Sequence, residues 1–266
     1  QRPHVATSGL LKTIERLART RPTGYNLFHS LSQMKAIVER EGAGLPNGLL
    51  RQARKIHADD ERACLAMAKH GSKLFKRKER ILTYCNTGAL ATGGIGTALG
   101  VIKYGFKKRL VTEVFACETR PVGQGARLTV WECAASGIPV TLICDNMAAA
   151  LMQAGKVDRI FVGADRIARN GDTSNKIGTF QLALIAKAFR IPFHVVAPAS
   201  TFDLSLKSGK AIVIEERKRD EVTGWITGLN KVENVRVWNP AFDVTPARLI
   251  TSYITEQGIM HPPFHY

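Results

Sequence analysis

A cysteine follows the first short apolar run of the chain and opens a loop of small residues. The run is Ile81–Tyr84, and Cys85 begins the segment CNTGALATGGIG. A thiol near the N-terminus of a helix tends towards the thiolate, which is the reactive form of cysteine. Two interpretations of Cys85 stay open, a reactive thiol that faces a ligand and an inert buried thiol. Its neighbours Asn86, Thr87 and Thr92 are able to hydrogen-bond a ligand.

The glycines of this loop come close to a dinucleotide-binding fingerprint but do not complete it. Leu99 stands where GxGxxG requires its third glycine, so we expect no nicotinamide cofactor. A glycine-rich loop between a strand and a helix still presents backbone N–H groups and a positive helix end, which suit a phosphate. The loop therefore predicts contact with a phosphorylated ligand.

An aspartate follows a later apolar run in the same way. Val157–Val162 leads through two small residues to Asp165, and an acid in such a place can approach a ligand closely. The alternatives are a helix cap and an ion pair with Arg166. Asn175 and Lys176 follow in the same loop, GADRIARNGDTSNKIGT, and an amide beside an ammonium suits a phosphate or sugar hydroxyls.

A third polar segment, ETRPVGQG, follows the apolar run Val111–Cys117. Arg120 and Gln124 in this segment are candidates to bind a polyol or an anion, and a surface ion pair is the alternative for Arg120. The sequence contains neither GxSxG nor HExxH, and its seven histidines lack the spacing of metal ligands. We therefore expect no metal site.

These residues act together only if the fold brings their loops to one place. Residues 1–78 space their apolar side chains at helical intervals, which predicts a helical subdomain. Residues 79–266 alternate short apolar runs with helical segments, one of which has Asp145 and Asn146 as its N-cap candidates. The sequence thus predicts an α/β fold, a Rossmann-like doubly wound parallel sheet with an N-terminal helical subdomain. Ligands bind such sheets beyond the carboxyl ends of the strands, where Cys85 and Asp165 would lie.

The chain is strongly basic. It has 266 residues with 38 Lys or Arg against 22 Asp or Glu, so its formal net charge is +16. Basic runs occur at Lys73–Arg80, Lys107–Arg109 and Arg217–Arg219. Aromatic residues make up only 7% of the chain, so few can stack on bases. A solvated surface, contact with nucleic acid and attraction of phosphorylated small molecules are the three interpretations of this charge.

The cysteines indicate a reducing compartment. Their number is five and no CxxC pair occurs, which argues against a disulfide framework and a zinc ribbon and favours the cytoplasm. Apart from Cys85 they are expected to be small buried apolar residues: Cys64, Cys117, Cys133 and Cys144. No apolar stretch approaches about 18 residues, so we expect no membrane-spanning helix and no membrane partner.

Taken together, the motifs resemble those of the methylthioribose-1-phosphate isomerase family, which also contains the regulatory subunits of translation initiation factor eIF2B. The resemblance runs from about Arg21 to about Gly258. It rests on ordered motifs at compatible spacing: RPTGYNLFHSL, ILTYCNTGALAT, ETRPVGQGARLTVWE, TLICDNMAA, VGADRIARNGDTSNKIGT, APASTFDL, IEER and NPAFDVTPARLIT.

The resemblance implies a phosphorylated pentose as substrate, a homodimer in the cytoplasm, and neither a cofactor nor a nucleic-acid partner. It places the catalytic cysteine of the family on Cys85 and the catalytic aspartate on Asp165. The substrate-binding residues of the family fall on Arg21, Gln124, Asn175 and Lys176. Candidate contacts between two copies are the apolar segment Ile250–Ile254 and the helices after Gln124.

The implied activity is the aldose–ketose isomerisation of 5-methylthioribose 1-phosphate in methionine salvage. An acid and a base suffice for it, with Asp165 exchanging protons with oxygens and Cys85 with carbon. Two alternatives stay open: which of the two residues is the base, and whether a hydride moves instead of a proton. The alternatives are a related isomerase for ribose 1,5-bisphosphate or 5-deoxyribose 1-phosphate, and a non-catalytic eIF2B-like regulatory subunit.

The sequence also departs from the family in a few places. An Arg-Gly-Ala segment that helps to hold the phosphate is not found, so either the numbering omits a leader or this member lacks that element. Tyr84 stands where a histidine is common, and Thr87 and Ile95 also differ from the usual loop. We expect such changes to retune the choice among sugar 1-phosphates.

Overall fold

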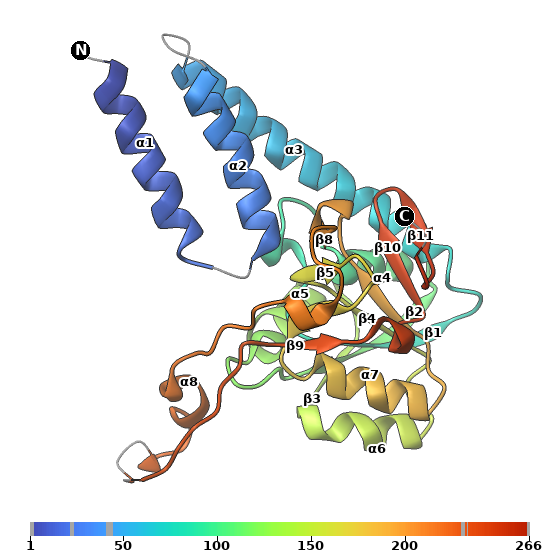
Figure 1. The fold of residues 1–266 in the computed structure, drawn as a ribbon. Helices are drawn as coiled ribbons and strands as arrows, with labels where there is room; N and C mark the ends of the chain where they lie inside the picture. The colour runs from blue at the N-terminus through green and yellow to red at the C-terminus, as the bar shows by residue number, and fades with distance from the viewer. Residues whose placement is uncertain (1–2, 22–23, 41–44, 230–231, 233, 265–266) are drawn as a thin grey trace.

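The computed structural model describes residues 3–21, 24–40, 45–229, 232 and 234–264. Three helices precede the sheet: α1 Pro3–Ala18, α2 Tyr25–Arg40 and α3 Leu45–Ser72. They stand at the upper left of Figure 1, and apolar residues such as Ile14 and Val38 pack between them. The second half of α3 packs on the sheet, where Cys64 and Met67 are fully buried. The predicted N-terminal helices are confirmed, and the division of the chain into two domains stays a prediction.

A seven-stranded sheet forms the centre of the molecule. Its strands are β1 Glu79–Thr83, β2 Val111–Cys117, β3 Val140–Ile143, β4 Arg159–Val162, β7 Phe193–Val196, β10 Ser252–Thr255 and β11 Gly258–Met260. They lie in the order β11-β10-β7-β4-β1-β2-β3, and only β11 runs antiparallel to its neighbour. The chain begins the sheet at β1 and winds outwards in both directions, which confirms the predicted doubly wound parallel sheet.

Helices cover both faces of this sheet (Figure 1). They are α4 Ala98–Lys107, α5 Val130–Ala135, α6 Ala148–Gln153 and α7 Thr179–Ala188. Because successive residues of a strand point to opposite faces, Ile81 packs with Met67 and Leu99 on one side, and Leu82 packs with Leu182 on the other. Short helical turns complete the connections: η1 Ala89–Ala91, η2 Gly125–Thr129 (a π-helical turn), η3 Asp145–Met147, η4 Ala199–Thr201, η5 Gly209–Ala211 and η7 Ala247–Leu249.

A second, four-stranded sheet stands where the sequence predicted a loop. Its strands are β5 Arg166–Ala168, β6 Thr173–Lys176, β8 Phe202–Asp203 and β9 Phe242–Thr245, in the order β8-β5-β6-β9. β5 and β6 form an antiparallel hairpin, and β6 pairs with β9, which follows more than sixty residues later. The segment Thr173–Lys176 is polar throughout, so it carries no apolar alternation from which a strand could be predicted.

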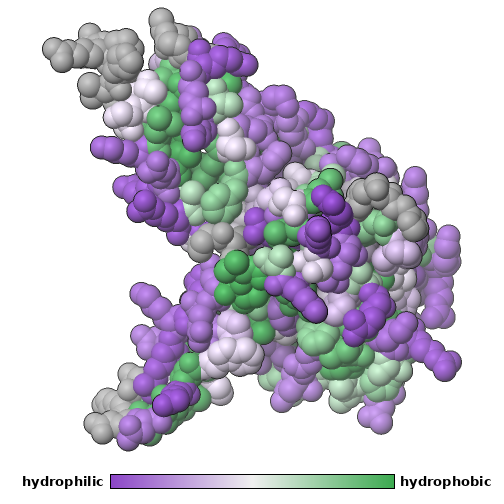
Figure 2. All heavy atoms as spheres, in the orientation of Figure 1, coloured by the Kyte–Doolittle hydropathy of each residue, from purple (hydrophilic) through white to green (hydrophobic). Residues whose placement is uncertain are grey.

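The segment between β8 and β9, residues 204–241, extends away from the core and is called the excursion below. It carries the short helix α8 Arg219–Thr223 and lies at the lower left of Figure 1. Val213, Trp225 and Trp238 are largely exposed along it. Figure 2 shows a hollow on this face of the molecule, between the excursion and the N-terminal helices. Among the described helices, none is both long and apolar enough to cross a membrane.

Three expectations from the sequence are wrong. Cys144 is exposed, because it directly follows the edge strand β3. Asp145 does not cap a helix, since its carboxylate accepts hydrogen bonds from the backbone N–H groups of Thr119 and Arg120. The segment Ile250–Ile254 contributes β10 and is mostly buried inside this chain, so it is not available to a second copy.

Candidate active site

Cys85 and Asp165 follow two neighbouring strands at the point where the strand order reverses. β1 and β4 pair in parallel, with Thr83 opposite Phe161. Cys85 comes two residues after Thr83, and Asp165 follows the end of β4 at Val162. Ligands of doubly wound sheets bind in the crevice at such a reversal. The fold therefore brings the two predicted catalytic residues to the same edge.

The backbone of Cys85 is held on both sides by threonines. Its N–H donates to Thr119 Oγ1 at 2.8 Å, and its carbonyl accepts from Thr129 Oγ1 at 2.6 Å. The residue has φ 62°, a left-handed conformation that costs a non-glycine residue roughly 1–2 kcal/mol. The two hydrogen bonds stabilise this conformation, which fixes the direction of the thiol.

The thiol is protonated in the free protein. The pKa of Cys85 is raised to about 11, chiefly by burial and to a lesser extent by the negative charge of Asp165. The Asn86 N–H and the cations Lys176 and Arg21 act in the opposite direction. Of the two interpretations that the sequence left open for Cys85, a thiolate in the free protein is thus not supported. The main reason is burial, and the helix end that could have opposed it is distant, because α4 begins only at Ala98.

Asp165 forms an ion pair with a residue from the N-terminal helices. Arg21, just after α1, donates from Nη2 to Asp165 Oδ1 at 2.9 Å, and the Asp165 side chain keeps only 19% of its surface exposed. Burial raises the pKa of Asp165, and Arg21 and Lys176 lower it. The alternative ion pair with Arg166 is not formed, since the Arg166 guanidinium contacts Asp203 and the ring of Tyr25 instead.

Asn175 and Lys176 end strand β6 beside this pair. The Asn175 amide is buried and donates to Thr179 Oγ1 at 3.0 Å. Lys176 Nζ donates to the carbonyl of Ala241 and lies 4.7 Å from the centre of the Phe242 ring. Lys176 thus adds positive charge to the Cys85–Asp165 site, whereas the Asn175 side chain is engaged in holding the start of α7.

In the segment after β2, Gln124 keeps an acceptor without a partner, whereas the side chain of Arg120 is fully engaged. Gln124 Oε1 is a buried acceptor without a hydrogen-bond partner, so it is able to accept a hydrogen bond from a ligand. The Arg120 guanidinium donates to the carbonyls of Pro121 and Val222 and stacks on Trp225, so it is neither an anion ligand nor part of a surface ion pair.

The loop after Cys85 uses its amides internally. The N–H groups of Ala89 and Leu90 donate to the buried carboxylate of Glu132, which also accepts from Lys103 Nζ at 2.7 Å. At Gly88 a Cβ atom would lie 2.2 Å from Glu132 Oε1, so only glycine fits there. The amides of Ala89 and Leu90 are therefore not free for a phosphate, which contradicts that part of the expectation.

The other polar side chains of this loop are engaged as well. Asn86 Nδ2 donates to Glu132, Thr87 Oγ1 accepts the N–H of Leu99, and the Thr92 hydroxyl donates to carbonyls of its own loop. Sequence reasoning missed Glu132, which organises the loop. Its signal was a carboxylate directly beside Cys133, a residue expected to be buried, in the helical part of the motif ETRPVGQGARLTVWE. Within the described residues, no three His, Cys, Asp or Glu side chains gather as metal ligands.

The sequence matches the model of the Initiation factor 2 subunit family over residues 6–262. It is 50% identical over 254 residues to the methylthioribose-1-phosphate isomerase of Thioalkalivibrio sulfidiphilus, a match that covers 96% of this chain and 73% of that protein. It is 52% identical over 252 residues to the protein of the same name from Pelotomaculum thermopropionicum, covering 93% of this chain and 69% of that one.

Two solved structures share the fold over nearly the whole chain. The 5-methylthioribose 1-phosphate isomerase from Pyrococcus horikoshii OT3 superposes with a TM-score of 0.89 at 43% identity, covering 99% of this chain and 75% of that structure. The translation initiation factor eIF-2B subunit delta from A. fulgidus superposes with a TM-score of 0.83, also at 43% identity, covering 97% and 76%. This chain is thus shorter than the proteins that it matches.

Proposed function

The chain belongs to the Initiation factor 2 subunit family, and we propose that it is an isomerase of this family that converts 5-methylthioribose 1-phosphate into 5-methylthioribulose 1-phosphate. The observation that carries the proposal is the meeting of Cys85 and Asp165 at the reversal of the sheet, with the cations Arg21 and Lys176 acting on both. Curated relatives at about 50% identity carry this activity in their names.

The reaction needs proton transfer at oxygen and at carbon. In an aldose 1-phosphate the phosphate occupies the anomeric oxygen, so the sugar cannot open to a free aldehyde. The ring C1–O bond breaks as an acid protonates the ring oxygen. The C2 proton is then removed, a proton is delivered to C1, and the 2-hydroxyl loses its proton as the carbonyl forms. The number of protons taken and given is equal, so an acid and a base are regenerated in each turnover.

Cys85 and Asp165 divide this work in our proposal. Asp165 protonates the ring oxygen and later accepts the proton of the 2-hydroxyl, while Cys85 takes the C2 proton and returns it to C1. The charges of the two groups are coupled, because the carboxylate raises the pKa of the thiol. Protonation of Asp165 therefore favours the thiolate of Cys85. The two groups share one proton, which is held either by the thiol or by the carboxyl group.

Arg21 sets the charge state of the pair. In the free protein it neutralises the Asp165 carboxylate through the contact at 2.9 Å. The substrate phosphate competes for the guanidinium, and an Asp165 that has lost this partner stays in a buried place where the neutral form is favoured. Binding of the substrate thus prepares Asp165 as the acid that opens the ring. Lys176, Gln124 and Asn175 remain the proposed groups that hold phosphate and hydroxyls.

Assembly and compartment belong to the same proposal. We infer a homodimer in the cytoplasm, with neither nucleic acid nor a membrane as partner. The helix after Gln124 exposes Trp131, and the excursion exposes Trp238, and both are apolar surfaces that a second copy would cover. A mass of one chain by sedimentation at micromolar concentration would contradict the dimer.

The test is proton NMR of substrate and product in deuterated water. Cys85→Ser and Asp165→Asn are each expected to lower kcat by about 10²-fold or more, because serine is a far weaker acid and asparagine cannot exchange the proton. Cys117→Ser and Cys133→Ser replace buried thiols elsewhere and are expected to leave the chemical step nearly intact. If the wild-type protein forms no ketose, the regulatory-subunit alternative, which the eIF-2B subunit structure represents, takes first place.

A further inference from the structure

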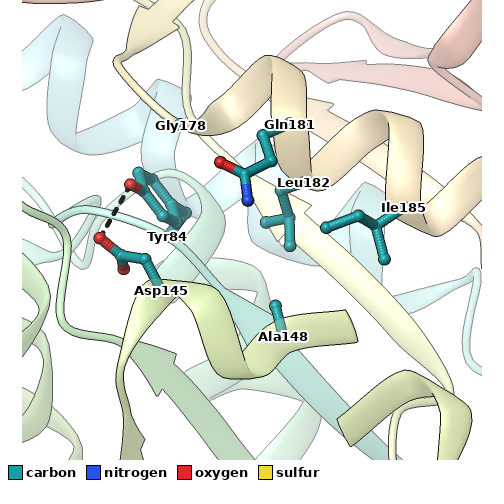
Figure 3. Close-up of a pocket in the computed structure, with 7 residues that line it drawn as sticks. All are labelled: Tyr84, Asp145, Ala148, Gly178, Gln181, Leu182 and Ile185. Carbon is teal, nitrogen blue, oxygen red and sulfur yellow. Dashed lines mark hydrogen bonds between the residues drawn. The ribbon is translucent and has the colours of Figure 1, made fainter. Parts of the chain in front are cut away.

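Tyr84 directly precedes Cys85, and it points away from the reacting groups. Its ring is buried in the core on the side of α6 and α7, with 3% of the residue exposed. Figure 3 shows its hydroxyl on the wall of a small pocket, beside Asp145 and Gly178. A residue so buried does not touch a substrate. The expectation that Tyr84 retunes the choice of sugar is thus not supported as a direct effect.

The Tyr84 hydroxyl meets two acceptors from separate parts of the chain. The carbonyl oxygen of Ile177 lies at 2.9 Å and Asp145 Oδ2 at 3.3 Å. A phenol has one hydrogen to donate, so these acceptors share it. Burial and the charge of Asp145 raise the pKa of the phenol, which therefore keeps this hydrogen. The hydroxyl joins the end of β1 to the residue that follows Lys176.

The backbone of Gly178 approaches the Tyr84 hydroxyl so closely that a side chain at this position would clash. A Cβ atom at Gly178 would lie 2.2 Å from the Tyr84 hydroxyl oxygen, and Gly178 has φ 102°, which a residue with a side chain rarely adopts. The Gly178 N–H is bound in turn by Asp243 Oδ2 at 2.7 Å. Gly178 thus packs directly against the Tyr84 hydroxyl, and the hydrogen bond from its N–H to Asp243 holds it in this place.

The Asp145 carboxylate extends the connection to Cys85 itself. Oδ1 accepts the N–H of Thr119 at 2.8 Å, and Oδ2 accepts the N–H of Arg120 at 2.7 Å. Thr119 has φ 66°, and in this conformation its Oγ1 accepts the N–H of Cys85. One chain of contacts therefore runs from the backbone of Cys85 through Thr119, Asp145 and Tyr84 to Ile177.

We propose that Tyr84 and Asp145 are positioning residues, which set the thiol of Cys85 relative to Lys176 by tying together the ends of β1, β2, β3 and β6. The proposal rests on the isomerase function proposed above, because only there does the distance between thiol and ammonium matter for turnover. Tyr84 is buried, and both carboxylate oxygens of Asp145 already accept backbone N–H groups. We therefore expect their loss to misplace the reacting groups without removing a binding contact.

The test removes single atoms from the connection. Tyr84→Phe deletes only the hydroxyl, and we expect kcat to fall about tenfold while KM stays within about twofold. Asp145→Asn replaces one of the two acceptor oxygens by an NH2 group, so only one of the two backbone N–H groups keeps its acceptor, and we expect a larger fall in kcat. The double variant is expected to lose less than the product of the two single losses, because both act through one connection.

Tyr253→Phe is the matched control. Tyr253 is also fully buried, and its hydroxyl also donates to a backbone carbonyl, that of Gly171. We expect its removal to lower thermal stability by a similar amount but to leave kcat within about twofold of wild type. Circular dichroism melts of all variants then separate a loss of folded protein from a loss of positioning.

A second measurement needs no turnover. The rate at which iodoacetamide alkylates Cys85, followed by peptide mass spectrometry against pH, reports the pKa of this thiol. A thiol released from its fixed place gains water, so we expect its pKa to fall by about half a unit or more in Tyr84→Phe and Asp145→Asn, and to stay unchanged in Tyr253→Phe. If the thiol pKa and kcat of Tyr84→Phe equal those of Tyr253→Phe, the proposal is overturned. If the wild type is inactive while the thiol pKa still shifts, the proposed function fails and the positioning connection stands.

Discussion

At the scale of single residues, the ion pair between Arg21 and Asp165 lowers the pKa of the carboxyl group that we propose as the catalytic acid. Arg21→Gln removes a positive charge that lowers the pKa of Asp165, so this pKa is expected to rise further. We then expect the limb of the pH profile of kcat/KM that the proposed mechanism assigns to Asp165 to move to higher pH. Carbon-13 NMR titration of the aspartate carboxyls measures the same shift directly. Arg62→Gln, which removes the partner of Asp59 on the surface of α3, is the control and is expected to leave the profile in place.

At the scale of elements, the loop after β1 depends on a carboxylate that α5 supplies. Glu132 is 3% exposed and pairs with Lys103 of α4, while also binding the loop amides of Ala89 and Leu90. Glu132→Gln leaves the Lys103 ammonium without a counter-charge, and breaking such a buried pair costs about 3–5 kcal/mol. Urea unfolding is the measurement.

The comparison for this prediction is an exposed pair. Lys35 and Glu39 lie at 3.6 Å on α2 with more than half of each side chain in solvent. Lys35→Ala is therefore expected to change the free energy of unfolding by about 0.5 kcal/mol or less. Equal losses in Glu132→Gln and Lys35→Ala would show that the loop does not depend on the buried carboxylate.

At the scale of the whole molecule, a buried histidine makes stability depend on pH. His194 of β7 bonds to Ser252 of β10 and Arg159 of β4, and burial together with the Arg159 charge lowers its pKa to about 3. The unfolded chain binds a proton at this residue below about pH 6.5, whereas the folded protein does not. The free energy of unfolding is therefore lost as pH falls from about 6.5 towards 3, by up to about 1.4 kcal/mol per pH unit.

His194→Gln tests this dependence. Glutamine keeps a polar side chain between Arg159 and Ser252 but cannot titrate. The variant is expected to be less stable at neutral pH, yet to lose less stability than the wild type on acidification. Because other groups such as Asp243 also titrate in this range, the quantity to measure is the difference between the two slopes in chemical denaturation. Parallel slopes would mean that His194 is not the group responsible.

The sequence by itself determined the framework of this protein. Apolar runs that alternate with helical segments require a doubly wound parallel sheet, and parallel strands place all of their following loops at one edge. For that reason Cys85 and Asp165, each just after such a run, could be expected near each other without any coordinates. The polar strand Thr173–Lys176 could not be predicted, because its partner β9 lies far along the chain and its own residues carry no apolar pattern.

Only the tertiary structure decided the protonation of Cys85 and Asp165 and the hydrogen bonds that the amides of the loop after Cys85 make. Arg21 reaches Asp165 across 144 positions of sequence, and Glu132 binds amides more than forty positions away. The thiol of Cys85 is protonated because burial outweighs the nearby cations, although its place after a strand suggested a thiolate. Burial and charge–charge interactions are sums over every group that the fold brings close, so local sequence does not contain them.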